Sequence, residues 1–283
     1  MLGSKAGDWV VEVTGENSEE SPYVAMTEKL IKGFLREGGT FQIEPDASSG
    51  SYFIGAAQLL PPYKFMEWSD HFGTNVETTE FNTLQVARWP TSGWQIDQEF
   101  KGILKLCESA NHVLKAKGDQ WTLEEQRLHI EERFKRDSVI SRKHHLGDSI
   151  MTAIVVAPFL NESIHFTDLG RLRVQESERV VVLRTELTKC GAKVIEEGDT
   201  LTVFPSEMHA AEIETYDDHR MAMCFAVVGL KVPGIKIRNP ACVKKTFPNF
   251  FQKLAGAPPH GLGTMILDAR SGRALGRDEL FAD

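Results

Sequence analysis

A run of charged residues precedes an apolar stretch in the C-terminal third of the chain. The run DDHR, residues 217–220, comes directly before MAMCFAVVGL, which has the small, apolar composition of a buried helix. Charged groups are seldom buried unless a partner neutralises them. An aspartate can cap the first turn of a helix, and an arginine beside that turn can bind a phosphate or a carboxylate. The pattern therefore predicts a helix start that faces an anionic ligand.

Two further segments gather basic residues, namely GRLRVQESER at 170–179 and CVKKTFPNFF at 242–251. The chain as a whole carries a net charge of −8, which argues against general attraction to nucleic acid or to anionic membranes. An isolated arginine at a helix start is more often a surface charge. Together, these basic residues suggest a cleft for a small, multiply anionic ligand.

Three segments share one design, in which an Asp opens an apolar helix rich in small residues. They are DASSGSYFIGAAQLL (46–60), DSIMTAIVVAPFL (148–160) and DHRMAMCFAVVGL (218–230). Amphipathic helices are predicted at 21–35, 97–110 and 176–192, and a hairpin at 193–205 around Glu197–Asp199. This order predicts an α/β fold in which a strand–helix–strand–helix–hairpin unit is used about three times. The alternative is a set of unrelated buried helices with ordinary caps.

The cellular setting is predicted from features that the chain lacks. Its four cysteines form no Cys-x-x-Cys pair, as expected in a reducing cytosol. The start has no apolar core of a signal peptide, and the longest apolar stretch, 150–160, is too short to span a bilayer. A cytoplasmic protein is expected. His144 and His145 could suggest a metal, but solvent-facing histidines are the preferred interpretation, and the charged helix at 123–137 is assigned no chemistry.

The segments quoted above resemble one enzyme family. DDHRMAMCFAVVGL followed by CVKKTFPNFF closely resembles the C-terminal signature of 5-enolpyruvylshikimate-3-phosphate synthase, an enolpyruvyl transferase of the shikimate pathway of aromatic amino acid biosynthesis. LRVQESER is similar to its Arg-Val-Lys-Glu-x-x-Arg segment, and DASSGSYF to its Asp-Ala-Ser-Ser-Ala-Ser-Tyr-Phe segment. HLGDSIMTAIVVAP resembles the stretch with its catalytic Asp. The related enolpyruvyl transferase that acts on UDP-N-acetylglucosamine fits less well, because it lacks the Asp-His-Arg-Met pattern.

The resemblance implies a fold of two domains, each a pseudo-threefold set of the repeated unit. Residues 46–256 are expected to form one enolpyruvyl transferase-like domain. Residues 1–45 are expected to be a remnant of the last unit of the other domain, and 257–283 a Pro/Gly linker and tail. Family members are longer, and their N-terminal Lys-Ser pair, Gly-rich loop and Ser-Ser-Gln triplet have no counterpart here.

The resemblance also assigns catalytic roles. Asp148 matches the base that takes the proton from the 5-hydroxyl of shikimate 3-phosphate and also holds its ring. Glu176 matches the carboxyl group thought to help protonate the enol carbon, with His219 beside it. The reaction is an addition–elimination through a tetrahedral phospholactoyl adduct. It requires an acid, a base and fixed positive charge, so no metal and no other cofactor is expected.

The same resemblance assigns substrate-binding residues. Arg179, Arg220 and Lys245 match the cations that bind phosphoenolpyruvate. Arg171 and Gln175 stand where the family places an Asn and a Lys, the latter a contact of shikimate 3-phosphate. These are substitutions at the substrate-binding positions.

Two functions remain open on the sequence. The first is enolpyruvyl transfer from phosphoenolpyruvate to shikimate 3-phosphate with release of phosphate, by an enzyme whose missing N-terminal domain is supplied by a longer native chain or a separate polypeptide. The isolated chain is then expected to be inactive alone. The second is a non-catalytic phospho-anion-binding domain or a decayed remnant of that enzyme.

Overall fold

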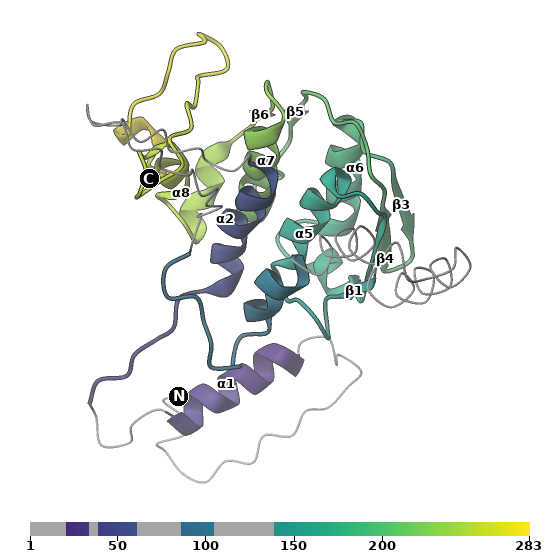
Figure 1. The fold of residues 1–283 in the computed structure, drawn as a ribbon, viewed down its shortest axis with the longest axis vertical. Helices are drawn as coiled ribbons and strands as arrows, with labels where there is room; N and C mark the ends of the chain where they lie inside the picture. Colours follow the sequence, from purple (N-terminus) through teal and green to yellow (C-terminus); the bar gives the residue numbers. More distant parts are fainter. Residues whose placement is uncertain (1–20, 34–38, 61–85, 105–138) are drawn as a thin grey trace, which may run out of the picture.

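The computed structural model describes residues 21–33, 39–60, 86–104 and 139–283 (Figure 1). The end of the helix predicted at 97–110 and the charged segment 123–137 lie outside these residues. Most of the segment 1–45 does so too. Within the described part, no helix is long and apolar enough to cross a membrane.

Within the described residues, the repeated unit occurs once in complete form. Its order is strand, helix, strand, helix and hairpin: β1 (Val139–Ser141), α5 (Ile150–Val156), β2 (Ile164–Thr167), α6 (Arg179–Lys189), β3 (Val194–Glu197) and β4 (Thr200–Val203). The sheet has the order β1-β2-β4-β3, with β1 and β2 parallel and the other pairs antiparallel. The predicted hairpin is confirmed, and Gly198 in its turn has a φ of 56°, a conformation that favours glycine. Short 3-10 helices, η4 (Ala157–Phe159) and η5 (Gly170–Val174), link these elements.

The strand–helix–strand–helix part recurs nearer the C-terminus. Its elements are β5 (Glu212–Ile213), α7 (His219–Lys231), β6 (Lys236–Ile237), η6 (Pro240–Lys245) and α8 (Phe250–Ala255), with β5 and β6 parallel. An isolated antiparallel bridge between Leu267 and Ala274 and the short η7 (Asp278–Leu280) follow.

The three helices of the Asp-first segments pack against one another in the core. They are α2 (Ala47–Leu59), α5 and α7, and Figure 1 shows them side by side. Small residues allow this close approach between helices. A Cβ added at Gly55 of α2 would lie 2.8 Å from Cγ2 of Thr152, and the Ser51 and Thr152 hydroxyls are 2.9 Å apart. The chain therefore has a mixed α/β fold with a shared helical core, rather than unrelated buried helices.

Two elements of the N-terminal half contact the residues at the start of α5. Helix α1 (Ser21–Gly33) confirms the first predicted amphipathic helix, and its Lys29 donates to the Gly93 carbonyl at 2.9 Å. The short η3 (Ile96–Glu99) continues as a helical turn to Leu104, the described part of the second. Both elements lie beside the start of α5.

Candidate active site

Two of the three predicted Asp caps are present. Asp46 accepts hydrogen bonds from the backbone amides of Ser48 at 3.0 Å and Ser49 at 3.2 Å, which begins α2. Asp218 accepts from the backbone amide of Arg220 at 2.9 Å, which begins α7. A side-chain oxygen at this position satisfies an amide that the helix itself leaves unpaired.

The third predicted cap is wrong. Helix α5 begins at Ile150 with Ser149 in the cap position, and the amide of Met151 donates to the backbone carbonyl of Asp148 at 3.3 Å, not to its carboxylate. The carboxylate of Asp97 accepts from the amides just before the helix, those of Gly147 at 2.8 Å and Ser149 at 3.1 Å. Because a distant residue satisfies these amides, the carboxylate of Asp148 can make other contacts.

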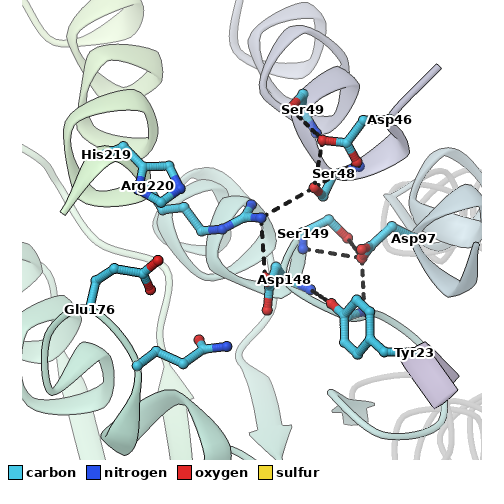
Figure 2. A network of polar contacts seen from close by, with 12 residues as sticks. Tyr23, Asp46, Ser48, Ser49, Asp97, Asp148, Ser149, Glu176, His219 and Arg220 are labelled. Carbon is cyan, nitrogen blue, oxygen red and sulfur yellow. Dashed lines mark hydrogen bonds and ion pairs between the residues drawn. The ribbon is translucent and has the colours of Figure 1, made fainter. Parts of the chain in front are cut away.

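Asp148 lies between two arginines, one on each carboxylate oxygen. Nη2 of Arg142 is 3.1 Å from Oδ1. Nη2 of Arg220 is 3.1 Å from Oδ2, as Figure 2 shows. Burial would raise the pKa of Asp148, but the charges of Arg220 and Arg142 outweigh it and lower the pKa below its ordinary value. Arg220 also donates to the hydroxyls of Tyr52 and Ser48 on α2, both at 3.3 Å. The pair of Asp148 and Arg220 is thus built from three helices.

Arg179 is the centre of a second group of contacts. Its side chain is 1% exposed and bonds to Asp218 in bidentate fashion, with Nε 2.7 Å from Oδ2 and Nη2 3.1 Å from Oδ1. Nη2 also contacts Glu176 at 2.7 Å, and Nη1 donates to Oε1 of Gln175. Bidentate pairing of this kind fixes the guanidinium in both position and plane. Asp218 therefore joins the start of α7 to the start of α6.

Glu176 bridges two cations at the edge of this group. One carboxylate oxygen contacts Arg179 and the other contacts Nζ of Lys245, whose side chain is 55% exposed. Burial would raise the pKa of Glu176, but the hydrogen bond from Lys245 and the charge of Arg179 outweigh it and lower the pKa. Glu176 is therefore ionised in this form.

His219 is buried beside both groups of contacts. Among the residues that the structure describes, its Nδ1 has no hydrogen-bond partner, and the nearest carboxylate oxygen, Oδ1 of Asp218, is 3.8 Å away. Burial, followed by the charge of Arg220, lowers the pKa of His219 to about 4. The imidazole is therefore neutral at neutral pH.

Relatives of this chain are found among named enzymes. The family model for EPSP synthase (3-phosphoshikimate 1-carboxyvinyltransferase) matches residues 93–254, more than half of the chain. The chain belongs to the EPSP synthase family. A 3-phosphoshikimate 1-carboxyvinyltransferase from Photobacterium profundum is 32% identical over 244 residues, which is 86% of this chain and 49% of that protein. The enzyme of the same name from Burkholderia orbicola is 32% identical over 276 residues, 90% of this chain and 57% of that protein.

Solved structures are also similar over part of the chain. An EPSP synthase from Acinetobacter baumannii is 28% identical, with a TM-score of 0.36, over 38% of this chain and 26% of that one. The chain spans about half the length of the curated relatives that it matches. The chain is therefore a partial member of the EPSP synthase family, and its own fold is mixed α/β.

In this member of the EPSP synthase family, the residues predicted for the site form two adjoining groups of side-chain contacts. Asp148 contacts Arg220, and Glu176 contacts both Arg179 and Lys245. Asp218 links the groups, since it accepts from the side chain of Arg179 and from the backbone of Arg220. Figure 2 shows the side chains of Asp148, Glu176, His219 and Arg220 gathered in one part of the structure.

The remaining predicted residues lie at the edge of the site or away from it. Gln175 bonds to Arg179, and Arg171 is half-buried in η5. His144 and His145 are exposed, and Nδ1 of His145 accepts from the Ser141 amide at 3.0 Å.

Several site residues were not predicted from the sequence. The clearest are Arg142, Asp97 and Tyr23, which contact Asp148 or the turn that carries it. Ser48 and Tyr52 lie in the segment DASSGSYF, so its likeness to the family could have identified them. Arg142 gave no such signal, because a lone arginine after a short strand is usually exposed.

Proposed function

We propose that this chain supplies one part of an active site that transfers the enolpyruvyl group of phosphoenolpyruvate to the 5-hydroxyl of shikimate 3-phosphate and releases phosphate. The observation that carries the proposal is the contact of Asp148 with Arg220, next to the Glu176–Arg179–Lys245 group. A base, a carboxyl group that can become an acid, and three cations adjoin one another. These are the groups that addition–elimination on an anionic enol phosphate requires.

Asp148 is the proposed base. Its lowered pKa keeps it ionised at neutral pH, so it can accept the proton of the 5-hydroxyl as that oxygen bonds to C2 of phosphoenolpyruvate. Arg220 then changes partner in part, from the carboxylate to the negative charge of the bound substrate. The addition is completed when Glu176 gives a proton to the methylene carbon, which yields the tetrahedral adduct with its methyl group. In the elimination the methyl group returns a proton to Glu176, the double bond forms again, and the C–O bond to phosphate breaks as the phosphate takes the proton held by Asp148.

The cations differ in how a ligand can reach them. Lys245 is 55% exposed and Arg220 is 14% exposed, whereas Arg179 is 1% exposed and is covered by its own carboxylate partners. An incoming carboxylate can therefore contact Arg220 and Lys245 directly. It reaches Arg179 by taking the place of Glu176.

This exchange gives Glu176 its proposed role as the acid. While Arg179 and Lys245 contact it, its pKa is lowered and it holds no proton. A substrate anion that takes over these cations removes the cause of the lowering and leaves a partly buried carboxyl group whose pKa rises. Glu176 can then protonate the methylene carbon, with the neutral His219 as a neighbouring hydrogen-bonding group.

The rest of the site belongs to the same proposal. Arg171 and Gln175 are the proposed contacts of shikimate 3-phosphate in this chain, and the family's other substrate contacts come from a complementing N-terminal domain. The setting is the cytoplasm, where this biosynthesis takes place. Domain limits at 45 and 256 belong to the proposal as well.

A second function is a phospho-anion-binding domain without catalysis. It is favoured by one observation: both carboxylate oxygens of the proposed base, Asp148, already contact arginines, whereas Lys245 is 55% exposed and can contact an anion from solvent.

Phosphate release from the two substrates separates these functions. The chain is assayed alone and with the N-terminal half of a full-length relative, and that half alone serves as the control. The proposal expects release only from the mixture. If the mixture is inactive although phosphoenolpyruvate binds to the chain, the non-catalytic function is favoured.

A further inference from the structure

The carboxylate of Asp97 holds the turn on which Asp148 stands. Asp97 belongs to η3, is 5% exposed and lies about fifty residues from that turn in sequence. Its Oδ1 accepts from the amide of Gly147 at 2.8 Å, from the amide of Ser149 at 3.1 Å, and from the Ser149 hydroxyl. The two residues that flank Asp148 are therefore bound to one oxygen atom.

Tyr23 of α1 lies against the same turn, close to Asp97. The amide of Asp148 donates to the Tyr23 hydroxyl at 3.0 Å (Figure 2). A Cβ added at Gly147 would overlap that hydroxyl and lie 2.9 Å from Oδ2 of Asp97. The turn is thus packed closely against Asp97 and Tyr23, with no space for a side chain at Gly147.

The segment that carries Asp97 also fixes the start of α2. Oε1 of Gln95 accepts from the amide of Ala47, and its Nε2 donates to the carbonyl of Pro45, both at 2.8 Å. The start of α2 carries Ser48, which contacts Arg220. One short segment therefore sets the positions of two helix starts that both contact Arg220.

We infer that Asp97 is a positioning residue, which holds the Gly147–Ser149 turn so that the carboxylate of Asp148 stays between Arg142 and Arg220. Its importance for turnover rests on the proposed function, but the positioning itself is a property of the folded chain. Asp97 touches no reacting atom and acts through Asp148.

The pKa of Asp148 distinguishes positioning from simple charge effects. Removal of a neighbouring negative charge can only lower the pKa of a carboxyl group or leave it unchanged. Movement of Asp148 away from its two arginines raises that pKa instead. The two effects have opposite signs, so one titration separates them.

The experiment is a ¹³C NMR titration of the Asp148 carboxyl carbon in the full chain, assigned by its disappearance in Asp148→Asn. In Asp97→Ala, which lacks all three hydrogen bonds, we expect the titration midpoint to rise by about one pH unit. In Asp97→Asn, whose amide oxygen can still accept, the midpoint stays or falls. Leu187→Val weakens the core within α6, away from the turn, and should leave the midpoint unchanged.

A midpoint in Asp97→Ala at or below that of the wild type overturns the inference. So does an equal rise in Leu187→Val, which would mean that general loosening suffices. If Asp97→Ala does not fold, the same titration of Asp148 is made on Asp97→Glu, which keeps the charge but lengthens the side chain against a closely packed turn. A rise is then expected, and its absence overturns the inference. These results do not depend on phosphate release, so the proposed function can fail separately.

Discussion

Replacement of Asp148 by alanine should destabilise the fold more than the loss of a helix cap would. The substitution takes the anion away from Arg142 and Arg220, whose side chains are 1% and 14% exposed. Removal of one partner from a buried ion pair costs about 3–5 kcal/mol. Because the Asp148 side chain is itself 16% exposed, we expect the lower end, about 3 kcal/mol. A lost cap alone would cost only about 1 kcal/mol.

The assay is urea unfolding at pH 7, with Asp199→Ala as the matched control. Asp199 also pairs with an arginine, Arg173, but its side chain is 57% exposed and Arg173 has further acidic partners. Exposed pairs of this kind contribute at most about 1 kcal/mol. Asp148→Asn should lie between wild type and Asp148→Ala, because the amide oxygen can still accept a hydrogen bond.

The difference in stability between wild type and Asp148→Ala should depend on pH with a definite sign. The pKa of Asp148 is lowered on folding, so its contribution is fully present above the unfolded pKa of about 3.9 and is lost as pH falls through the folded value. The stability gap between wild type and Asp148→Ala should therefore narrow below about pH 4. Equal stability of Asp148→Ala and wild type at pH 7, or a gap that widens in acid, would refute the reasoning.

Three further predictions concern the histidine, the helix core and the ligand. His219 should titrate near pH 4 by NMR. The free energy of unfolding should fall as pH drops from about 6.5 towards 4, because the unfolded chain then binds a proton that the folded chain does not. A titration midpoint near pH 6.5 would contradict the burial of His219. Gly55→Ala should lower the free energy of unfolding, measured in urea, by about 1–3 kcal/mol, because its Cβ meets α5. Gly102→Ala, which has open space around its Cβ, should raise it by up to about 1 kcal/mol. Equal effects of the two substitutions would contradict the close helix packing. Calorimetry of the isolated chain with phosphoenolpyruvate or glyphosate should give a dissociation constant weaker than about 1 μM, and tighter binding would mean that the site is complete.

The helices could be predicted from the sequence because their signals are local. An Asp before a run of small apolar residues located the starts of α2 and α7, and the amphipathic pattern located α6. The hairpin around Gly198 followed from alternation and a turn residue. Propensity, capping and periodicity act over a few residues, so they are visible in a linear chain.

The hydrogen bonds and ion pairs of the site could not be predicted, since they depend mainly on pairs far apart in sequence. The same Asp-first pattern was wrong as a cap for α5, because Asp97 bonds to Gly147 and Ser149 across about fifty residues. Arg142 and Asp148 are only six residues apart, but their pairing, which makes the burial of Arg142 possible, depends on the irregular connection between β1 and α5. Local patterns identify which residue types stand at a helix start, but tertiary contacts decide which of them supplies the hydrogen bonds.

The most direct test of the central claim is the rate of phosphate release from phosphoenolpyruvate and shikimate 3-phosphate in the mixture of this chain with a relative's N-terminal half. Wild type is compared with Asp148→Asn, which keeps the side-chain volume and removes the base. Loss of a positioned base typically lowers the rate by about 100- to 10,000-fold. The account predicts a loss in that range with the fold intact, as checked by thermal unfolding. A folded Asp148→Asn variant that releases phosphate within a few-fold of wild type would contradict it and make Glu176 the first candidate for the base.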